Sequence, residues 1–426
     1  MRAMKDSGVE WIGEIPQDWD RTKLLNLLRV PISDGPHETP KLINSGIPFI
    51  SVDSVGNGEN IDLTVCKKFI SEEDYINYSK KTKIESGDIL FTKAATIGKT
   101  AIVRDEIFMV WSPIAIIKTN NEIVHNKYIY YVLSSSEFIK HVSLLGSYNT
   151  QINVGMRELE RAMISLPPKD KQKSIVAYLD SKCSKIDTII EKQQAVIEKL
   201  KEYKLSVITE AVTKGLNPDV EMKDSGVEWI GEVPRHWEVV KFGRCISIAS
   251  NLVNPNNYLD YPQVSPECIE KNTAKLLDYK TVFESGVISW NHLFYKGQII
   301  YSKIRPLLNK VIIAPFDGLC SADMYPIDTA ENHKFIVYVI LSNYFKAQVG
   351  VVIENRVKMP KINQSELSNI VVFMPCIDEQ KRIVEFLDEE CEKIERLIAS
   401  KELLIKKLME YKKSLIYEVV TGKKEV

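Results

Sequence analysis

The sequence predicts an α+β protein with an internal repeat, in which two mixed α/β domains are separated by two long helices that form an antiparallel coiled coil. Three observations predict this fold. Certain segments, which we call the frame, occur twice along the 426 residues, and each copy ends in a long stretch with an apolar heptad pattern. The strand-rich stretches between the frame segments, which we call the bodies, differ from each other. One frame carrying two different bodies indicates two versions of one task, related by a pseudo-twofold repeat.

The repeat is clearest at the start and at the end of each half. Residues 4–19 read MKDSGVEWIGEIPQDW and residues 222–237 read MKDSGVEWIGEVPRHW, an offset of 222 − 4 = 218. A second repeat opens at Pro167 (PPKDKQKSIVAYLD) and at Pro375 (PCIDEQKRIVEFLD), an offset of 375 − 167 = 208. Between these landmarks there is only a faint echo, GDILFTK at 87–93 against GQIIYSK at 297–303.

The two long helices are predicted from their composition and spacing. Residues 172–213 contain no glycine or proline, and apolar residues recur in steps of mostly four and three. The predicted seam is Leu179, Cys183, Ile186, Ile190, Ile197, Leu200 and Val207 in the first helix, and Leu387, Cys391, Ile394, Ile398, Ile405, Leu408 and Leu415 in the second. Polar residues interrupt it at Gln193 and Lys204, and at Lys401 and Lys412.

Each helix is expected to be on the order of 60 Å long, and a lone helix with one apolar stripe needs a partner. We expect the other copy, packed antiparallel, because the two registers match position for position. The alternative is two unrelated helices that each pack on their own domain. Asp170 and Asp378 are predicted N-caps, and Gly215 and Gly422 are predicted stops.

These landmarks divide the chain into four parts. We expect a first domain over residues 1–166, a first long helix over 167–215, a second domain over 216–374 and a second long helix over 375–426. Strands are predicted at 47–52, 88–92, 100–103 and 311–314, and helices at 125–134 and 333–342.

Composition limits the class of protein. The formal net charge is −1, so any nucleic-acid surface must be a local patch. Seven cysteines without a C-x-x-C pair argue against a disulfide framework or a zinc ribbon and favour a reducing cytoplasm. There is no secretory signal and no apolar stretch near the length of about 18 residues that crosses a bilayer. We therefore expect a soluble cytoplasmic protein with no membrane partner.

Signatures of catalysis are missing from the sequence. An adenine methyltransferase needs a glycine-rich cofactor loop and an Asn/Asp-Pro-Pro-aromatic motif, and neither occurs. Gly98-Lys99-Thr100 resembles the end of a P-loop, but the required upstream glycine is Lys93. The six histidines form no metal-binding pair. We expect no catalytic residue, no cofactor and no metal, which favours a binding protein.

Along its whole length the chain resembles the specificity (S) subunit of type I restriction–modification enzymes. The resemblance is carried by SGVEWIGEIP and SGVEWIGEVP, by the Pro-x-x-Asp-x-Gln-x-x-Ile-Val-x-aromatic-Leu-Asp segments, and by residues 301–306, 321–326 and 356–363. One departure is Lys171 before Gln172, where the second copy has the usual Glu379 before Gln380. This change affects surface charge only.

The resemblance implies a function and partners. It implies two target-recognition domains, held apart by the coiled coil, that each read one half of a split, asymmetric site on double-stranded DNA. It also implies two methyltransferase (M) subunits per chain and restriction/translocase (R) subunits, which carry adenine-N6 methylation and restriction. The S subunit itself performs no chemistry. Sequence would be read at base edges, and the coil would set the gap between the half-sites.

Polar and basic residues in the bodies are the candidates for DNA contact. In the first body they follow the Gly87 strand and the segment 147–151: Thr92, Lys93, Lys99, Tyr148, Asn149 and Gln151. In the second body they are Lys303, Arg305, Lys310, Asn355, Arg356, Lys358 and Lys361. Arg305 and Arg356 suit bidentate contact with guanine, and the lysines suit phosphates. The alternative for each cation is a solvated or ion-paired surface position.

The repeated tryptophans have a structural interpretation. Trp11, Trp229, Trp19 and Trp237 are predicted to be packing anchors against the long helices rather than stacking platforms.

Three other functions compete with DNA recognition. They are a self-contained DNA-modifying enzyme, which needs the missing motifs, a coiled-coil adaptor without a DNA role, and a silent S cassette that works only after recombination.

Overall fold

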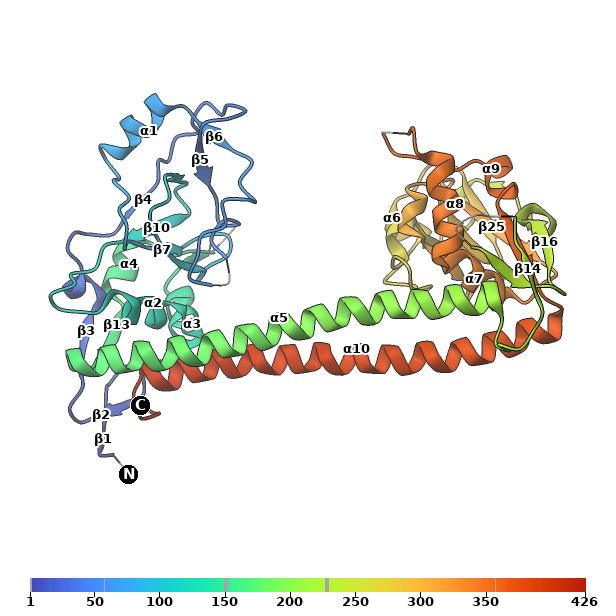
Figure 1. Cartoon of the computed structure of the whole chain (residues 1–426). Helices are drawn as coiled ribbons and strands as arrows, with labels where there is room; N and C mark the ends of the chain where they lie inside the picture. The colour runs from blue at the N-terminus through green and yellow to red at the C-terminus, as the bar shows by residue number, and fades with distance from the viewer. Residues whose placement is uncertain (1, 57, 149–151, 227–229, 357) are drawn as a thin grey trace. The chain divides into compact units, whose positions relative to one another are not determined.

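The computed structural model describes residues 2–56, 58–148, 152–226, 230–356 and 358–426. The chain divides into two compact units: unit 1 contains Met1–Gln193 and Leu403–Val426, and unit 2 contains Gln194–Glu402. Two long helices, α5 (Lys169–Lys214) and α10 (Ile377–Val420), each begin in one unit and end in the other (Figure 1).

The body of unit 1 is a mixture of short strands and helices. Its elements are β1 Met4–Asp6, β2 Glu14–Pro16, β3 Asp20–Lys23, β4 Ser33–Asp34, β5 Ile47–Ile50, β6 Phe69–Ile70, α1 Glu72–Ser79, β7 Ile89–Thr92, β8 Thr100–Ile102, β9 Met109–Val110, β10 Ile114–Ile117, α2 Asn126–Ser134, α3 Ser136–Leu144, β11 Ser147–Tyr148, β12 Ile152–Asn153, α4 Met156–Arg161 and β13 Met163–Leu166.

The body of unit 2 has a similar composition: short strands come first, then a pair of helices, a short helix and a final strand. Its elements are β14 Met222–Asp224, β15 Glu232–Pro234, β16 Glu238–Lys241, β17 Ile246–Ile248, β18 Leu252–Val253, β19 Pro262–Val264, β20 Lys280–Thr281, α6 Val282–Ser285, β21 Asn291–Phe294, β22 Ile299–Ser302, β23 Val311–Ile313, β24 Gly318–Cys320, β25 Met324–Thr329, α7 His333–Leu341, α8 Asn343–Ile353, α9 Gln364–Ser368 and β26 Val371–Met374.

A four-stranded antiparallel sheet is common to both bodies. Its strand order is β4-β10-β7-β8 in unit 1 and β17-β25-β22-β23 in unit 2. The registers correspond, because Ile114 pairs with Thr92 and Met324 pairs with Ser302. The strands predicted at 88–92, 100–103 and 311–314 belong to this sheet, and the helices predicted at 125–134 and 333–342 are α2 and α7.

The second sheet of each body differs between the units. In unit 1 it has three strands in the order β6-β5-β9, and in unit 2 it has five in the order β18-β21-β24-β19-β20. The two halves therefore share a frame and a central sheet but carry different outer parts.

The long helices pack against each other within each unit. In unit 1, Leu179 and Cys183 of α5 share a buried cluster with Leu415 of α10. In unit 2, Ile208 of α5 shares one with Leu387 of α10. Residue numbers rise along one helix as they fall along the other, since 187 meets 412 and 204 meets 395. The pair is therefore an antiparallel coiled coil.

The burial of the seam follows its heptad pattern. Leu179, Cys183, Ile186, Ile197, Leu387, Cys391, Ile394 and Leu415 are buried, and Ile190, Leu200, Val207, Ile398, Ile405 and Leu408 are half-buried. Two of the polar interruptions form ion pairs between the helices. Lys204 Nζ lies 2.5 Å from Glu395 and Lys412 Nζ lies 2.7 Å from Asp187. These two pairs occupy equivalent positions, because both 412 − 204 and 395 − 187 equal 208.

The prediction of the N-caps was wrong. The helices begin at Lys169 and Ile377, so Asp170 and Asp378 lie inside the first turn. A carboxylate there interacts favourably with the helix dipole without capping it.

The predicted stops are confirmed. Gly215 and Gly422 have φ of 74° and 73°, the left-handed conformation that ends a helix.

The tryptophans of the frame pack against these helix ends. A Cβ on Gly422 would lie 3.2 Å from the ring of Trp19, and one on Gly215 would lie 3.2 Å from the ring of Trp237. Trp11 is buried and donates from Nε1 to the Met163 carbonyl. Trp19 and Trp237 therefore pack at the ends of the long helices, as predicted, while Trp11 packs edge-on against Phe138 of α3. Trp229 lies outside the described residues.

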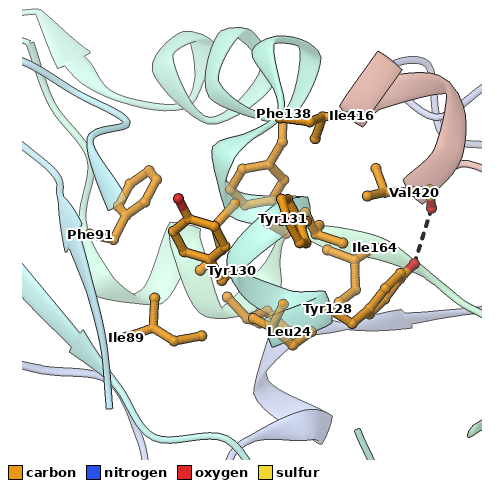
Figure 2. Close-up of a cluster of buried hydrophobic side chains, with 14 of the residues drawn as sticks. Leu24, Ile89, Phe91, Tyr128, Tyr130, Tyr131, Phe138, Ile164, Ile416 and Val420 are labelled. Carbon is orange, nitrogen blue, oxygen red and sulfur yellow. Dashed lines mark hydrogen bonds between the residues drawn. The ribbon is translucent and has the colours of Figure 1, made fainter. Parts of the chain in front are cut away.

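A polar contact closes the core of unit 1 onto the end of α10. The Tyr128 hydroxyl donates to the Val420 carbonyl at 3.0 Å inside an apolar cluster that includes Leu24, Phe138 and Ile416 (Figure 2). The last turns of α10 are thus part of the hydrophobic core of unit 1.

Among the described residues, no single helix has the length and apolar composition to cross a membrane. Helices α7 and α8, which meet at a bend of 60°, have the length and apolar composition of a membrane span only when they are taken together. Phe335 and Ile336 of α7 and Phe345 of α8 are buried in the core of unit 2.

Candidate nucleic-acid interface

Both units build the same backbone arrangement where the central sheet meets the segment after the helix pair. In unit 1, the Lys93 carbonyl accepts from the Val154 amide at 2.9 Å, and in unit 2 the Lys303 carbonyl accepts from the Ile362 amide at 2.9 Å. Isolated bridges beside these bonds join Ala94 to Asn153 and Ile304 to Lys361. The β7–β8 loop (93–99) and the β22–β23 loop (303–310) are thereby each tied to a second loop.

Residues in the left-handed region cluster at these ties. Ala95 has φ of 62° and Arg305 has φ of 44°, at equivalent places in the two loops. Met359, beside the hydrogen bond from the Arg305 amide to the Pro360 carbonyl, has φ of 45°. Each such residue costs about 1–2 kcal/mol and persists only where surrounding contacts hold it. Strain of this kind is concentrated at functional sites.

In unit 2 the tie gathers five predicted residues into what we call the basic cluster: Lys303, Arg305, Arg356, Lys358 and Lys361. Two carboxylates contact the cluster. Lys361 Nζ lies 2.8 Å from Asp323, and Arg356 donates to Glu366 at 3.1 Å. Among the described residues, the five cations of the cluster outnumber the two carboxylates that form ion pairs with it.

The members of the basic cluster differ in how they are held. The Arg356 guanidinium beside Glu366 keeps the pKa of that carboxyl below its ordinary value. Lys303 Nζ lies 5.2 Å from the centre of the Tyr325 ring. Among the residues that the structure describes, neither Lys303 nor Arg305 forms an ion pair. Arg305 and Lys358 are exposed.

The two remaining predictions in unit 2 lie apart from this tie. Asn355 is exposed just before Arg356. Lys310 is half-buried at the far end of its loop, and its ammonium donates to the Pro266 carbonyl at 2.5 Å. The geometry therefore gives Lys310 a role in holding the loop.

In unit 1 the side chains of two residues predicted to contact DNA, Thr92 and Lys93, are buried in the fold. Thr92 is fully buried, and its hydroxyl accepts from the Lys99 amide at 2.9 Å, which closes the β7–β8 loop. The Lys93 side chain is only 8% exposed and lies 3.2 Å from Asp34. DNA contact by these side chains is not available in this conformation, because their polar atoms are committed to the fold.

The other predictions in unit 1 are less enclosed. Lys99 is half-buried and donates to the Val52 carbonyl at 3.1 Å. Tyr148 belongs to β11, which pairs with β12. Asn149 and Gln151 lie outside the described residues.

Sequence reasoning missed two residues of this neighbourhood, Asp34 and His37. They contact each other at 3.4 Å and lie beside Lys93. The available signal was the Asp-Gly-Pro-His run at residues 34–37, since a glycine next to polar residues can mark a position where the backbone is closely approached.

The described residues contain no group of three or more histidine, cysteine, aspartate or glutamate side chains arranged to hold a metal ion. The seven cysteines are free thiols. The arrangement of strained, polar and basic loops can bind a polyanion through charge and hydrogen bonds.

Comparison with known proteins gives consistent results. The family model described as "Type I restriction modification DNA specificity domain" matches residues 17–199 and 234–404. The Escherichia coli type I restriction enzyme EcoDI specificity subunit is 28% identical over 394 residues, covering 88% of this chain and 82% of that protein. The MjaVIII specificity subunit of Methanocaldococcus jannaschii is 29% identical over 432 residues, covering 96% and 93%.

A solved structure shares the fold. It comes from a study of complex assembly and conformational transition of the type I R-M system, and it superposes with a TM-score of 0.67 at 14% identity. The superposition covers 96% of this chain and 99% of that one.

Proposed function

Because the chain belongs to the type I restriction–modification DNA specificity family, we propose that it reads a split, asymmetric DNA site and directs adenine-N6 methylation and restriction by partner subunits. The chain is a specificity subunit, and such subunits are non-catalytic. In this proposal residues 1–166 and 216–374 are the target-recognition domains, and residues 167–215 and 375–426 are the spacer helices.

One observation carries the proposal. The same loop tie occurs in both units, yet the side chains on it differ, with Ala95 in one unit where the other has Arg305. A shared backbone holding different side chains suits two readers of different base sequences. Two different half-sites make a target without twofold symmetry.

The basic cluster supports the DNA contact. Arg305 is exposed and forms no ion pair with any residue that the structure describes, so it suits the O6 and N7 acceptors of guanine in the major groove, and Lys358 suits a phosphate. Arg356 and Lys361 form ion pairs, and phosphates would compete with Glu366 and Asp323 for them. A local surplus of positive charge agrees with a chain whose formal net charge is −1.

The repeated helices support two methyltransferase subunits per chain. Besides the seam, each helix carries a second apolar heptad that is exposed. It consists of Ile189, Val196 and Tyr203 in α5, and of Leu397, Leu404 and Tyr411 in α10, at an offset of 208. The same stripe offered twice suits two copies of one partner. We further propose that R subunits join this assembly.

The test is a genome-wide map of N6-methyladenine in cells that express the M subunit with and without this chain. We expect methylation at one split, asymmetric motif that depends on the chain. Replacing Arg305 and Lys361 together by alanine should weaken or relax one half of the motif and leave the other half intact. As a control, Lys358→Ala should lower occupancy similarly for all sequences.

The alternatives predict other outcomes. A coiled-coil adaptor would leave the methylation map unchanged, and the purified complex would show no salt-sensitive DNA binding. A silent cassette would leave the map unchanged although the purified complex binds DNA.

A further inference from the structure

A buried carboxylate lies beneath an exposed histidine in unit 1. The Asp34 side chain, at the end of β4, is only 9% exposed, while the His37 side chain is 74% exposed. Asp34 Oδ2 lies 3.4 Å from His37 Nε2 and 3.2 Å from Lys93 Nζ. Within the described part of the chain, this oxygen has ionic contacts but no hydrogen bond of good geometry.

The segment that carries His37 is held on both sides. Asp34 pairs with Ala115 in the central sheet, and its carbonyl accepts from the Thr82 hydroxyl at 3.0 Å. A Cβ on Gly35 would lie 2.0 Å from the Val110 carbonyl oxygen, so this position admits only glycine. His37 thus follows a backbone that is fixed at Asp34 and Gly35, and its Nε2 lies within contact distance of a buried carboxylate.

The contacts of the group determine which edge of the His37 ring is available. Lys93 supplies the counter-charge of Asp34, so the buried carboxylate already has a cationic partner. Nε2 is the ring nitrogen that lies toward Asp34, so Nδ1 is on the other edge, and the tautomer that carries its proton on Nε2 offers Nδ1 as an acceptor. An oriented acceptor of this kind matches an exocyclic amino group, N6 of adenine or N4 of cytosine, in the major groove.

The position of His37 relates it to the loop tie. Lys93, which contacts Asp34, is the residue whose carbonyl is bonded to the Val154 amide. Asn153, exposed next to it, bridges to Ala94. His37 therefore lies at the place in unit 1 that corresponds to the basic cluster in unit 2.

Unit 2 lacks the carboxylate. Ser33 pairs with Ile116 in unit 1, and the Ala249 amide donates to the Pro326 carbonyl at the equivalent place in unit 2. The residue after Ala249, at the position of Asp34, is Ser250. Lys303, the counterpart of Lys93, lies over Tyr325 instead.

We propose that His37 is a base-reading residue of unit 1, that it accepts a hydrogen bond from an adenine or cytosine amino group, and that Asp34 and Lys93 are its positioning residues. This inference rests on the proposed function and adds a residue and a base chemistry to it. The cost of burying a charged pair beneath a surface histidine agrees with a functional role, because an apolar pair at that place would be at least as stable.

The test uses the complete chain assembled with its M subunits. Competition binding is measured with duplexes that carry each of the four bases at every position of the two half-sites. We expect His37→Phe to reduce discrimination at one position of one half-site by about tenfold or more. His37→Gln, which keeps an acceptor, should retain part of it.

Two further variants separate positioning from reading. Asp34→Asn should lower discrimination at the same position, because the ring loses its orienting charge. Glu38→Gln, in the same exposed segment, is the matched control and should change affinity for all sequences alike.

The results that overturn the inference are distinct from those that overturn the proposed function. If the unaltered assembly reads a split site and His37→Phe discriminates equally well at every position, the role of His37 is wrong and the proposed function stands. Equal losses in both half-sites would also contradict it. If the unaltered assembly shows no sequence preference, the proposed function fails and the inference fails with it.

Discussion

At the scale of single residues, the repeated glutamine of the Pro-x-x-Asp-x-Gln segment has a clear structural role. Gln172 accepts from the His125 amide at 2.7 Å and donates to the Pro167 carbonyl at 2.9 Å. Gln380 does the same with the Asn332 amide at 3.0 Å and the Pro375 carbonyl at 2.9 Å. Each glutamine joins the start of a long helix to the start of a body helix. The sequence repeats it because both junctions are built alike.

The first prediction tests this junction. Gln380→Leu leaves the Asn332 amide and the Pro375 carbonyl without these partners in a buried place. We expect the free energy of unfolding of unit 2 to fall by about 2 kcal/mol. Urea titration of the assembled chain checks it, with the exposed neighbour Lys381→Ala as the control. A loss equal to that of the control would contradict the role of Gln380.

The residues of the candidate site were less predictable than those of the seam. Seam residues recur with a fixed period, so Leu179 and Cys183 follow from spacing alone. The partners of Arg356 and Lys361 lie 10 and 38 residues away, a separation that no local pattern encodes. The same holds for Lys93, whose exposure could not be judged without its partner Asp34.

At the scale of elements, the polar interruptions of the heptad help to determine how α5 and α10 pair. Lys204 is buried in the seam and reaches Glu395, and Lys412 reaches Asp187 at the equivalent position. A parallel pairing, or one shifted by a heptad, would leave a lysine in the seam without its carboxylate. The interruptions therefore oppose wrong pairings more than they add to stability.

A charge exchange tests this second prediction. Lys204→Glu places two carboxylates together and should lower the free energy of unfolding by about 2 kcal/mol. The double variant Lys204→Glu with Glu395→Lys should recover most of the loss, as a double-mutant cycle of thermal unfolding would show. Lys412→Glu with Asp187→Lys is the matched pair. If neither double variant recovers the lost stability, the proposed role of these ion pairs in pairing the helices is wrong.

The third prediction concerns acid. Burial acts to raise the pKa of the Glu395 carboxyl, but the ammonium groups of Lys204 and Lys275 outweigh burial and hold the pKa below its ordinary value. A carboxyl with a depressed pKa contributes stability above its unfolded pKa and loses it as the pH falls through the folded value. The advantage of the unaltered chain over Glu395→Gln in unfolding free energy should therefore shrink below about pH 4.

Urea titrations at several pH values measure this difference. The exposed pair of Glu392 and Arg396 provides the control, because Glu392→Gln should show a small effect at every pH. An advantage that stays constant to pH 3 or so would show that Glu395 does not carry it.

Long elements were more predictable than short ones. The helices over residues 169–214 and 377–420 follow from composition and period. The outer sheets contain strands of two to four residues, such as β18 and β20, which are too short for an alternating pattern to be recognised. Their pairing depends on contacts between distant segments. A local hydrophobic pattern therefore could not predict that one outer sheet has three strands and the other five.

At the scale of the whole molecule, the proposed function links the length of the spacer helices to the gap between the two DNA half-sites, which can be measured. The fourth prediction is that deleting one heptad from each helix, residues 190–196 and 398–404, shortens the gap between half-sites and leaves both half-sites unchanged. Seven residues span about 10 Å of helix, comparable to three base pairs. Methylation mapping reads out the new spacing, and an unchanged gap would rule out the spacer role.

A matched change keeps this test specific. Deleting the heptad from one helix alone removes residues 190–196 without their partners and should break the register of the seam. That variant should lose stability rather than acquire a new spacing.

The division of the chain into units also has a consequence for its synthesis. Unit 2 is contiguous, whereas unit 1 needs Leu403–Val426, which the ribosome makes only after 402 − 194 + 1 = 209 intervening residues. At ordinary rates of translation this takes on the order of ten to forty seconds. Until then Tyr128 lacks the Val420 carbonyl, and Trp19 lacks the helix end on which it packs. The nascent first body thus waits with an open core, exposed to chaperones and proteases, until the whole of unit 2 has been synthesised.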